Sequence, residues 1–82
     1  MHMASSSEVK GLVKHLAGRL AKVRGQRSQR QFARELGVFQ QNVNRYEAGT
    51  TPHPNFLLTL ALKEKVSLDW LLLGRGKPRR AR

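Results

Sequence analysis

Apolar side chains recur every three or four residues along most of this chain, which is the spacing of helices with one buried face. The first such stripe lies between residues 8 and 24, and it consists of Val9, Leu12, Val13, Leu16, Leu20 and Val23. Ser5 and Glu8 have capping-box spacing, in which two side chains satisfy backbone N–H groups at a helix start. Since Gly25 suits a helix end, the pattern predicts an amphipathic helix that stops there.

Two short helices follow in the pattern, separated by a glycine. Ser28 and Gln31 repeat the capping-box spacing, and Gly37 is expected to adopt the left-handed conformation that turns a chain sharply. The inward positions are Phe32, Ala33 and Leu36 in the first of these helices, and Val43, Tyr46 and Glu47 in the second. Two short helices joined by a tight glycine turn predict a helix-turn-helix.

The rest of the pattern predicts two more helical segments. Pro54 suits the first position of a helix over residues 55–65, and Ser67 is a candidate N-cap for a last turn that ends at Gly74. The inward positions of the 55–65 helix are Phe56, Leu57, Leu60 and Ala61. Because no useful stretch alternates with period two, we expect an all-α fold of five helices.

The same pattern divides the chain into three parts. Residues 1–7 form an N-terminal segment, interpreted in part as a cloning remnant, and residues 8–74 form one helical domain. Residues 75–82, "RGKPRRAR", have a single apolar residue, so this basic tail is expected to be disordered when free.

Charge indicates the class of partner. The net charge is +11, with eight Lys and Arg against one acidic residue in 8–34 and five against none in 75–82. Such an arrangement fits a polyanion that is approached from one face and held by an arm, although an acidic membrane surface or protein satisfies the same charges. The tail itself is either a DNA contact or a solubilising end.

Several classes of protein are not expected. The chain has no Cys, its histidines lack metal-ligand spacing, and it has neither a Ser–His–acid constellation nor a phosphate-binding glycine loop. We therefore expect no enzyme, metal or cofactor. No apolar run approaches the ~20 residues that span a bilayer, and "MHMASSS" lacks the regions of a signal peptide. These features favour a cytoplasmic protein with no membrane partner.

Uncharged amides gather on the second short helix. Gln40, Gln41, Asn42 and Asn44 fall within five residues. At about 100° per residue, Gln41, Asn44 and Arg45 share the side opposite the inward face, with Gln40 at its rim. Gln and Asn can pair with adenine through two hydrogen bonds, and Arg with guanine, so this side can read base edges. The alternative is a solvated polar face.

The segment "SQRQFARELGVFQQNVNRYEAG" followed by "PNFLLTLALKEKVSLDWLLLG" resembles the Cro/CI family of phage and bacterial repressors, which includes the Xre regulators. The resemblance covers about residues 9–74, and its most specific positions are Gln29, Ala33, Gly37, Val43, Glu47 and Pro54. It implies a five-helix lambda-repressor-like DNA-binding domain. It also implies sequence-specific binding of duplex DNA through the major groove by a transcriptional regulator, with a repressor expected.

The resemblance also assigns roles to residues. Gln40, Gln41 and Arg45 match its base-reading positions, and Asn44, where contact varies between members, is added to them. Gln29 matches the position of a phosphate contact. The other residues expected to bind phosphate are Arg27, Arg30, Arg34, Asn42 and Asn55, with at least one of the three arginines on phosphate and the rest solvated. Gln29 would also support the recognition helix, and Glu47 would pair with a basic residue of the first helix, either Lys22 or Arg24.

The chain departs from its relatives at three places. Phe39 stands where they usually carry a Ser or Thr N-cap, so that cap is lost and Phe39 is left to touch a thymine methyl instead. The loop of residues 50–53 lacks the usual Lys or Arg for phosphates, a role that the basic ends of the chain would take over. Glu64 replaces a common core Leu.

An exposed leucine patch predicts a homodimer on DNA. Leu58 and Leu62 point away from the assigned core, and the last turn adds further leucines; the expected patch is Leu58, Leu62, Leu72 and Leu73. A two-fold dimer would place two recognition helices about 34 Å apart along the duplex. Ordinary surface leucines are the alternative.

Two other functions fit parts of the sequence. An antitoxin or adaptor-type protein-interaction module would use the exposed leucines and the charged tail, with DNA binding secondary or absent. A nonspecific nucleic-acid coating protein would need only the charge.

Overall fold

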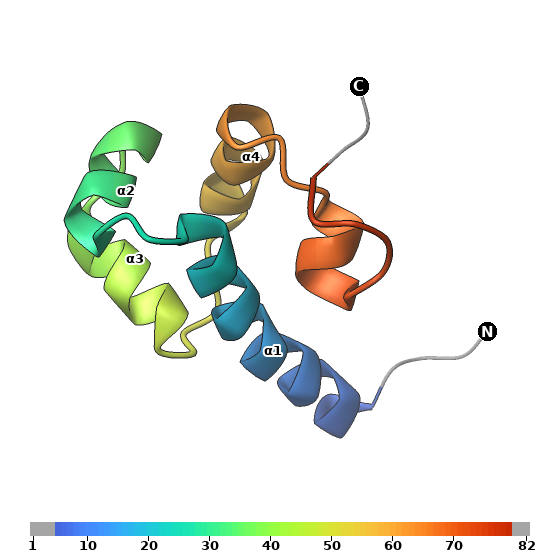
Figure 1. Cartoon of the computed structure of the whole chain (residues 1–82). Helices are drawn as coiled ribbons and strands as arrows, with labels where there is room; N and C mark the ends of the chain where they lie inside the picture. The colour runs from blue at the N-terminus through green and yellow to red at the C-terminus, as the bar shows by residue number, and fades with distance from the viewer. Residues whose placement is uncertain (1–4, 80–82) are drawn as a thin grey trace.

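The computed structural model describes residues 5–79. Its helices, in chain order, are α1 (Ser6–Arg24), α2 (Gln29–Leu36), α3 (Gln40–Glu47), α4 (Pro54–Lys63) and the wide turn η1 (Asp69–Leu73) (Figure 1). Within the described residues, β pairing is limited to an isolated bridge between Val66 and Arg79. The predicted all-α fold with five helices is confirmed.

The starts of α1 and α2 show how local hydrogen bonds place the helices. The N–H of Glu8 donates to Ser5 Oγ at 3.1 Å, and the N–H of Ser5 donates to Glu8 Oε1 at 3.3 Å, so the predicted capping box is complete. The box predicted at Ser28 is only half formed. The N–H of Gln31 donates to Ser28 Oγ at 2.9 Å, but the Gln31 side chain donates to Glu35. In a full box Gln31 Oε1 would accept the N–H of Ser28; here the side chain is instead held by a charge-assisted hydrogen bond from its Nε2 to the Glu35 carboxylate.

The turn between α2 and α3 has the predicted geometry. Gly37 adopts φ 75° and ψ 33°, a left-handed conformation that side chains other than glycine rarely accept. The N–H of Val38 then donates to the carbonyl of Ala33 at 3.0 Å, and Val38 packs against the core. This turn fixes the direction in which α3 leaves α2.

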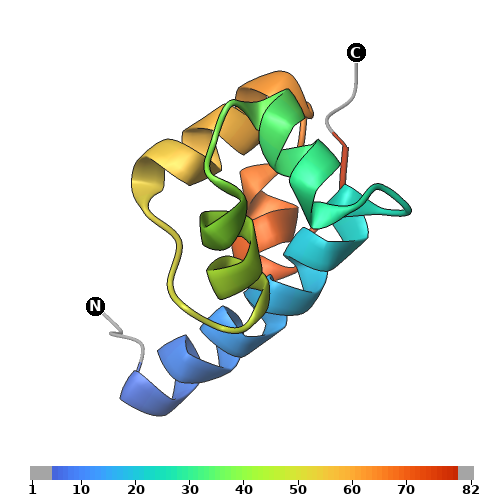
Figure 2. The ribbon, with the colours of Figure 1, turned by 90° about the vertical axis from the view of Figure 1, so that its left-hand side faces the viewer.

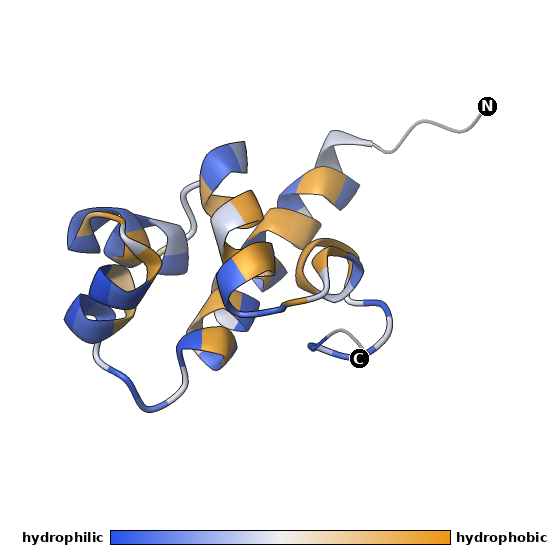
Figure 3. Ribbon diagram, turned by 90° about the horizontal axis from the view of Figure 1, so that it is seen from above, coloured by the Kyte–Doolittle hydropathy of each residue, from blue (hydrophilic) through white to orange (hydrophobic). Residues whose placement is uncertain are grey.

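The core lies between α1 and the four shorter elements. Figure 2, which views the molecule from the side of α2 and α3, shows α3 between α1 and α4. The largest fully buried side chains are Leu20, Phe32, Val43, Leu60, Val66 and Leu71. The rings of Tyr46 and Phe56 meet edge to face with centroids 4.8 Å apart, which joins α3 to α4. In Figure 3, hydrophobic stretches of the helices gather in the middle of the molecule, while the loops that connect the helices are mostly hydrophilic or intermediate.

The second half of the fold follows the predicted pattern with one shift. α4 begins at Pro54 and buries Phe56, Leu60 and Ala61, as predicted. It ends at Lys63 rather than at residue 65, because Lys65 adopts a φ of 56° and the chain leaves the helix. The N–H of Trp70 donates to Ser67 Oγ at 3.3 Å, which supports Ser67 as the cap of the last turn.

Residues 75–79 lie against the segment between α4 and η1. The N–H of Ser67 donates to the carbonyl of Pro78 at 2.8 Å, and the Arg79 guanidinium donates to the carbonyl of Glu64. Composition predicted disorder for the whole tail; residues 80–82 of that tail lie outside the described residues, as do residues 1–4. Among residues 5–79, no helix is long and apolar enough to cross a membrane.

Candidate nucleic-acid interface

The helix α3 is held by one face only. Val43 and Tyr46 are 1% and 9% exposed, so they anchor α3 in the core. Gln40, Gln41, Asn44 and Arg45 are all exposed, as a helix with that anchor requires. The four residues expected to read bases therefore share one outward surface, and Phe39, Gln40, Gln41 and Asn44 line a shallow hollow on it.

A chain of hydrogen bonds connects this surface to α1. Asn44 Nδ2 donates to Gln29 Oε1 at 3.2 Å, and Gln29 Nε2 donates to Glu47 Oε1 at 3.1 Å. Glu47 then accepts two hydrogen bonds from the Arg24 guanidinium, at 2.8 and 3.0 Å. Hydrogen bonding to Glu47 raises the pKa of Arg24. Of the two partners left open for Glu47, Arg24 is the one observed.

The same chain changes what Asn44 and Gln29 have available. Asn44 retains its side-chain oxygen and one N–H after donating to Gln29, so it can still form a hydrogen bond outward. Gln29 bridges α2 to both the middle and the end of α3. Of the two roles expected for Gln29, its contacts in this fold therefore favour support of α3.

Arg27 lies at the centre of a partly buried ion cluster. Its guanidinium donates to Glu35 at 2.8 Å, to Glu64 at 2.9 Å and to two carbonyls at the end of α1, those of Val23 and Arg24. These ion pairs join α1, α2 and the end of α4. The hydrogen bond to Glu64 raises the pKa of Arg27, and hydrogen bonds from Arg27 and Gln31 lower the pKa of Glu35.

This cluster favours a structural role for Arg27 over the expected contact with phosphate. Its guanidinium also lies 4.6 Å from the centroid of the Phe32 ring. All three guanidinium nitrogens of Arg27 already donate hydrogen bonds within the protein, and the side chain is only 24% exposed. The cluster also accounts for Glu64, at a position where the resemblance implied a core Leu: its carboxylate accepts hydrogen bonds from Arg27 and lies 3.7 Å from the guanidinium of Arg79.

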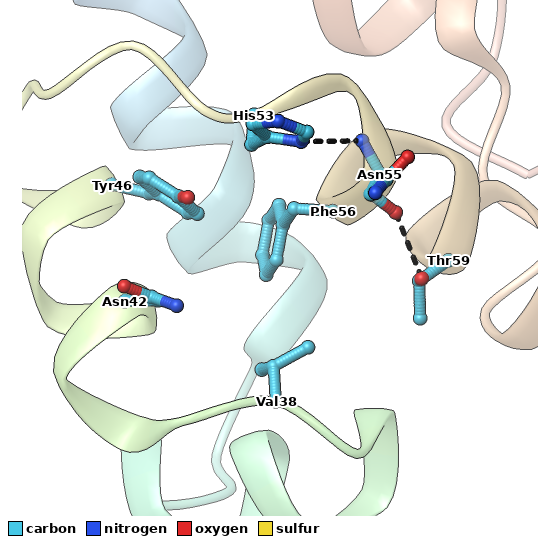
Figure 4. A pocket seen from close by; sticks show the side chains of 7 residues that line it. All are labelled: Val38, Asn42, Tyr46, His53, Asn55, Phe56 and Thr59. Atoms are coloured by element: carbon cyan, nitrogen blue, oxygen red, sulfur yellow. Dashed lines mark hydrogen bonds between the residues drawn. The ribbon is translucent and has the colours of Figure 1, made fainter.

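The other residues expected to bind phosphate fall into two groups. Arg30 and Arg34 are exposed on α2. Asn42 and Asn55 line one cavity of about 210 Å³ between α3 and α4, together with Val38, Tyr46, His53, Phe56 and Thr59 (Figure 4). Amides from the start of α3 and the start of α4 therefore line different sides of one cavity (Figure 4).

One feature of this region was missed by sequence reasoning. His53 caps α4, because its Nδ1 accepts the N–H of Asn55 at 3.1 Å (Figure 4). Its place directly before a helix-initiating proline was the available signal. A second arrangement agrees with an expectation from the sequence, that the basic ends of the chain substitute for the loop of residues 50–53: Lys10 and Lys14 of α1 line a hollow with Gly49 and Thr51.

The predicted leucine patch is only partly exposed. Leu58 and Leu62 are 55% and 74% exposed on α4. Leu73 is 44% exposed and lines a hollow with Leu12 and His15 of α1. Leu72 packs against the core, because the wide turn η1 brings it inward beside the buried Leu71.

Two short helices, a left-handed glycine between them and a second helix with an exposed amide face define a helix-turn-helix domain. A sequence model of the helix-turn-helix family matches residues 20–71. The chain belongs to the Cro/CI-type, Xre-like family of helix-turn-helix proteins, as its sequence predicted. This is a family of DNA-binding regulators of transcription and not of enzymes. No solved structure matches the chain significantly.

Proposed function

We propose that this protein is a sequence-specific repressor that binds duplex DNA through the major groove as a homodimer. The observation that carries the proposal is the outward face of α3, where Gln40, Gln41, Asn44 and Arg45 are exposed together. Amides and Arg present the donors and acceptors that distinguish bases, whereas a face built for solubility would gain more from Lys and Glu. Such a function would place the protein in the cytoplasm, beside the DNA.

Rigidity of the recognition helix supports the same proposal. Base reading requires side chains that keep their place when DNA arrives, since ordering them on binding costs affinity. Asn44 is held through Gln29 and Glu47 to Arg24, so α3 is connected to α1 by polar side chains as well as by its buried face.

Affinity independent of sequence would come from cations and amides around α3. Arg30 and Arg34 on α2, and Lys10 and Lys14 on α1, are exposed and stand on different elements. Asn42, Asn55 and Gln29 would add uncharged N–H donors for phosphate oxygens. Arg27 is left out, because its guanidinium is engaged by Glu35 and Glu64.

Preference for duplex over single-stranded DNA tests this function. We expect a labelled 30-base-pair duplex to bind more tightly than either of its single strands, because α3 fits the major groove of B-DNA, and to bind less tightly as salt rises. Fluorescence anisotropy at several salt concentrations measures both. Equal affinity for the duplex and the single strands would favour the coating protein, and no binding to either would favour the interaction module.

The exposed leucines of α4 supply the proposed dimer contact. Leu62→Lys is expected to weaken self-association at least tenfold, because burial of one Leu contributes about 1.5–3 kcal/mol and a two-fold axis counts it twice. Sedimentation equilibrium measures the change. Val9→Lys is the matched control, since Val9 is also exposed but lies on α1.

Two outcomes would contradict this interface. If Leu62→Lys associates as the parent does while Val9→Lys does not, the contact lies on α1. If the parent is monomeric with and without DNA, the leucines of α4 are instead available to a different protein, as the antitoxin or adaptor function requires.

A further inference from the structure

Phe39 contributes little to the folded protein by itself. Its side chain is 74% exposed at the position directly before α3. Its neighbour Val38 packs against the core, whereas Phe39 turns outward. As the N-cap of α3, it forms no side-chain hydrogen bond to the first turn, which a Ser or Thr would form. The position therefore combines an exposed aromatic ring with an uncapped helix start.

The surroundings of Phe39 are polar and face outward. It lines one hollow together with Gln40, Gln41 and Asn44, and these three are amides of the proposed base-reading surface. When a duplex meets that surface, the ring of Phe39 is covered at the same time. The partner that covers it must offer an apolar group next to base edges that amides can read.

The major groove contains one apolar group, the C5-methyl of thymine, which stands beside the hydrogen-bonding edge of the A·T pair. In helix-turn-helix docking, the N-terminal residues of the recognition helix meet the base edges. Phe39 comes one residue before Gln40 and two before Gln41, so the ring and the amides reach the same or adjacent base pairs.

We propose that Phe39 is a specificity-determining residue that reads the C5-methyl group of a pyrimidine in each half-site. The inference rests on the proposed function, because it requires α3 to lie in the major groove. It goes further by assigning an apolar readout to a position outside the four polar base-reading residues. The same contact makes binding sensitive to methylation of cytosine, whose C5-methyl occupies the equivalent place.

Deoxyuridine tests the contact because it differs from thymidine only by the missing methyl. In a duplex that the parent protein selects, each thymine is replaced in turn by deoxyuridine, and dissociation constants are measured for the parent, Phe39→Ala and Val9→Ala. At one thymine or two in each half-site we expect a loss of roughly fourfold for the parent and Val9→Ala, and none for Phe39→Ala. Val9→Ala is the control for removal of an exposed apolar side chain elsewhere.

Two further measurements separate the contact from effects on folding. Phe39→Ser is expected to raise Tm by roughly 4–8 °C, because it adds the missing N-cap, and still to lose the response to deoxyuridine. The second measurement uses two duplexes that carry cytosine or 5-methylcytosine in place of the critical thymine. The parent protein is expected to bind the duplex with 5-methylcytosine more tightly. Phe39→Ala should not distinguish the two.

The outcomes distinguish this inference from the proposed function. If the protein selects a sequence but deoxyuridine has no effect, or has the same effect in Phe39→Ala, the methyl contact is wrong and the regulator stands. If no sequence is selected from random duplexes, the proposed function fails and the methyl contact fails with it.

Discussion

Replacing Arg27 with methionine is expected to lower the free energy of unfolding by about 2–3 kcal/mol, because the change removes one partner from a partly buried ion cluster. Methionine keeps most of the apolar stem, so the lost stability measures the contribution of the guanidinium contacts. Glu64 would keep only the more distant Arg79, while the carbonyls of Val23 and Arg24 would each lose a donor.

Urea unfolding followed by circular dichroism measures this change. Arg30→Met is the matched control, since Arg30 is exposed on α2 and its replacement should alter the free energy of unfolding by less than about 0.5 kcal/mol. The structural role of Arg27 would be contradicted if both variants were equally stable and Arg27→Met lost affinity for random duplex DNA. Arg27 would then contact phosphate after all.

Gln41→Ala is expected to cost about 1–3 kcal/mol of binding free energy on a matched site, with little effect on random duplex DNA. Gln41 is exposed in the first turn of α3, so its removal should leave the fold intact. The loss arises because a base edge in the matched site loses its amide partner. Random DNA is held by phosphate contacts that do not involve this side chain.

Competition between matched and random duplexes measures this difference directly. Gln26→Ala is a matched control, because Gln26 is an exposed amide in the turn between α1 and α2. It should change neither affinity. An equal loss on both duplexes for Gln41→Ala would mean that Gln41 supports general affinity and reads no base.

Features that depend on residues close in sequence were predictable for this chain. The capping box of Ser5 and Glu8 and the left-handed turn at Gly37 each involve contacts within five residues. The buried faces of the helices also follow from local periodicity, because a stripe of apolar side chains must meet a core wherever that core lies. The outward amide face of α3 was predictable for the same reason.

Features that depend on distant residues were not predictable. Arg27 looked like any other cation of the basic segment, because nothing local indicates that Glu35 and Glu64 converge on it. Leu72 was expected outside, but the wide turn η1 carries it inward. Glu64 looked like a core defect until the fold placed two guanidinium groups beside its carboxylate.

The partner of Glu47 shows what the family resemblance added and where it stopped. The resemblance implied a basic partner in the first helix but left two, because the segment between that helix and the next is short. Only the folded chain distinguishes them: Arg24 reaches Glu47 with two hydrogen bonds and also donates to the Arg27 carbonyl.

Selection of binding sequences from a random duplex library, with the purified protein at moderate salt, tests the central claim most directly. We expect enrichment of an inverted repeat whose half-sites are about one helical turn apart, as two recognition helices related by a two-fold axis require. Enriched DNA with no shared motif would contradict the claim. In that case the cations bind DNA, and the amides of α3 do not read it.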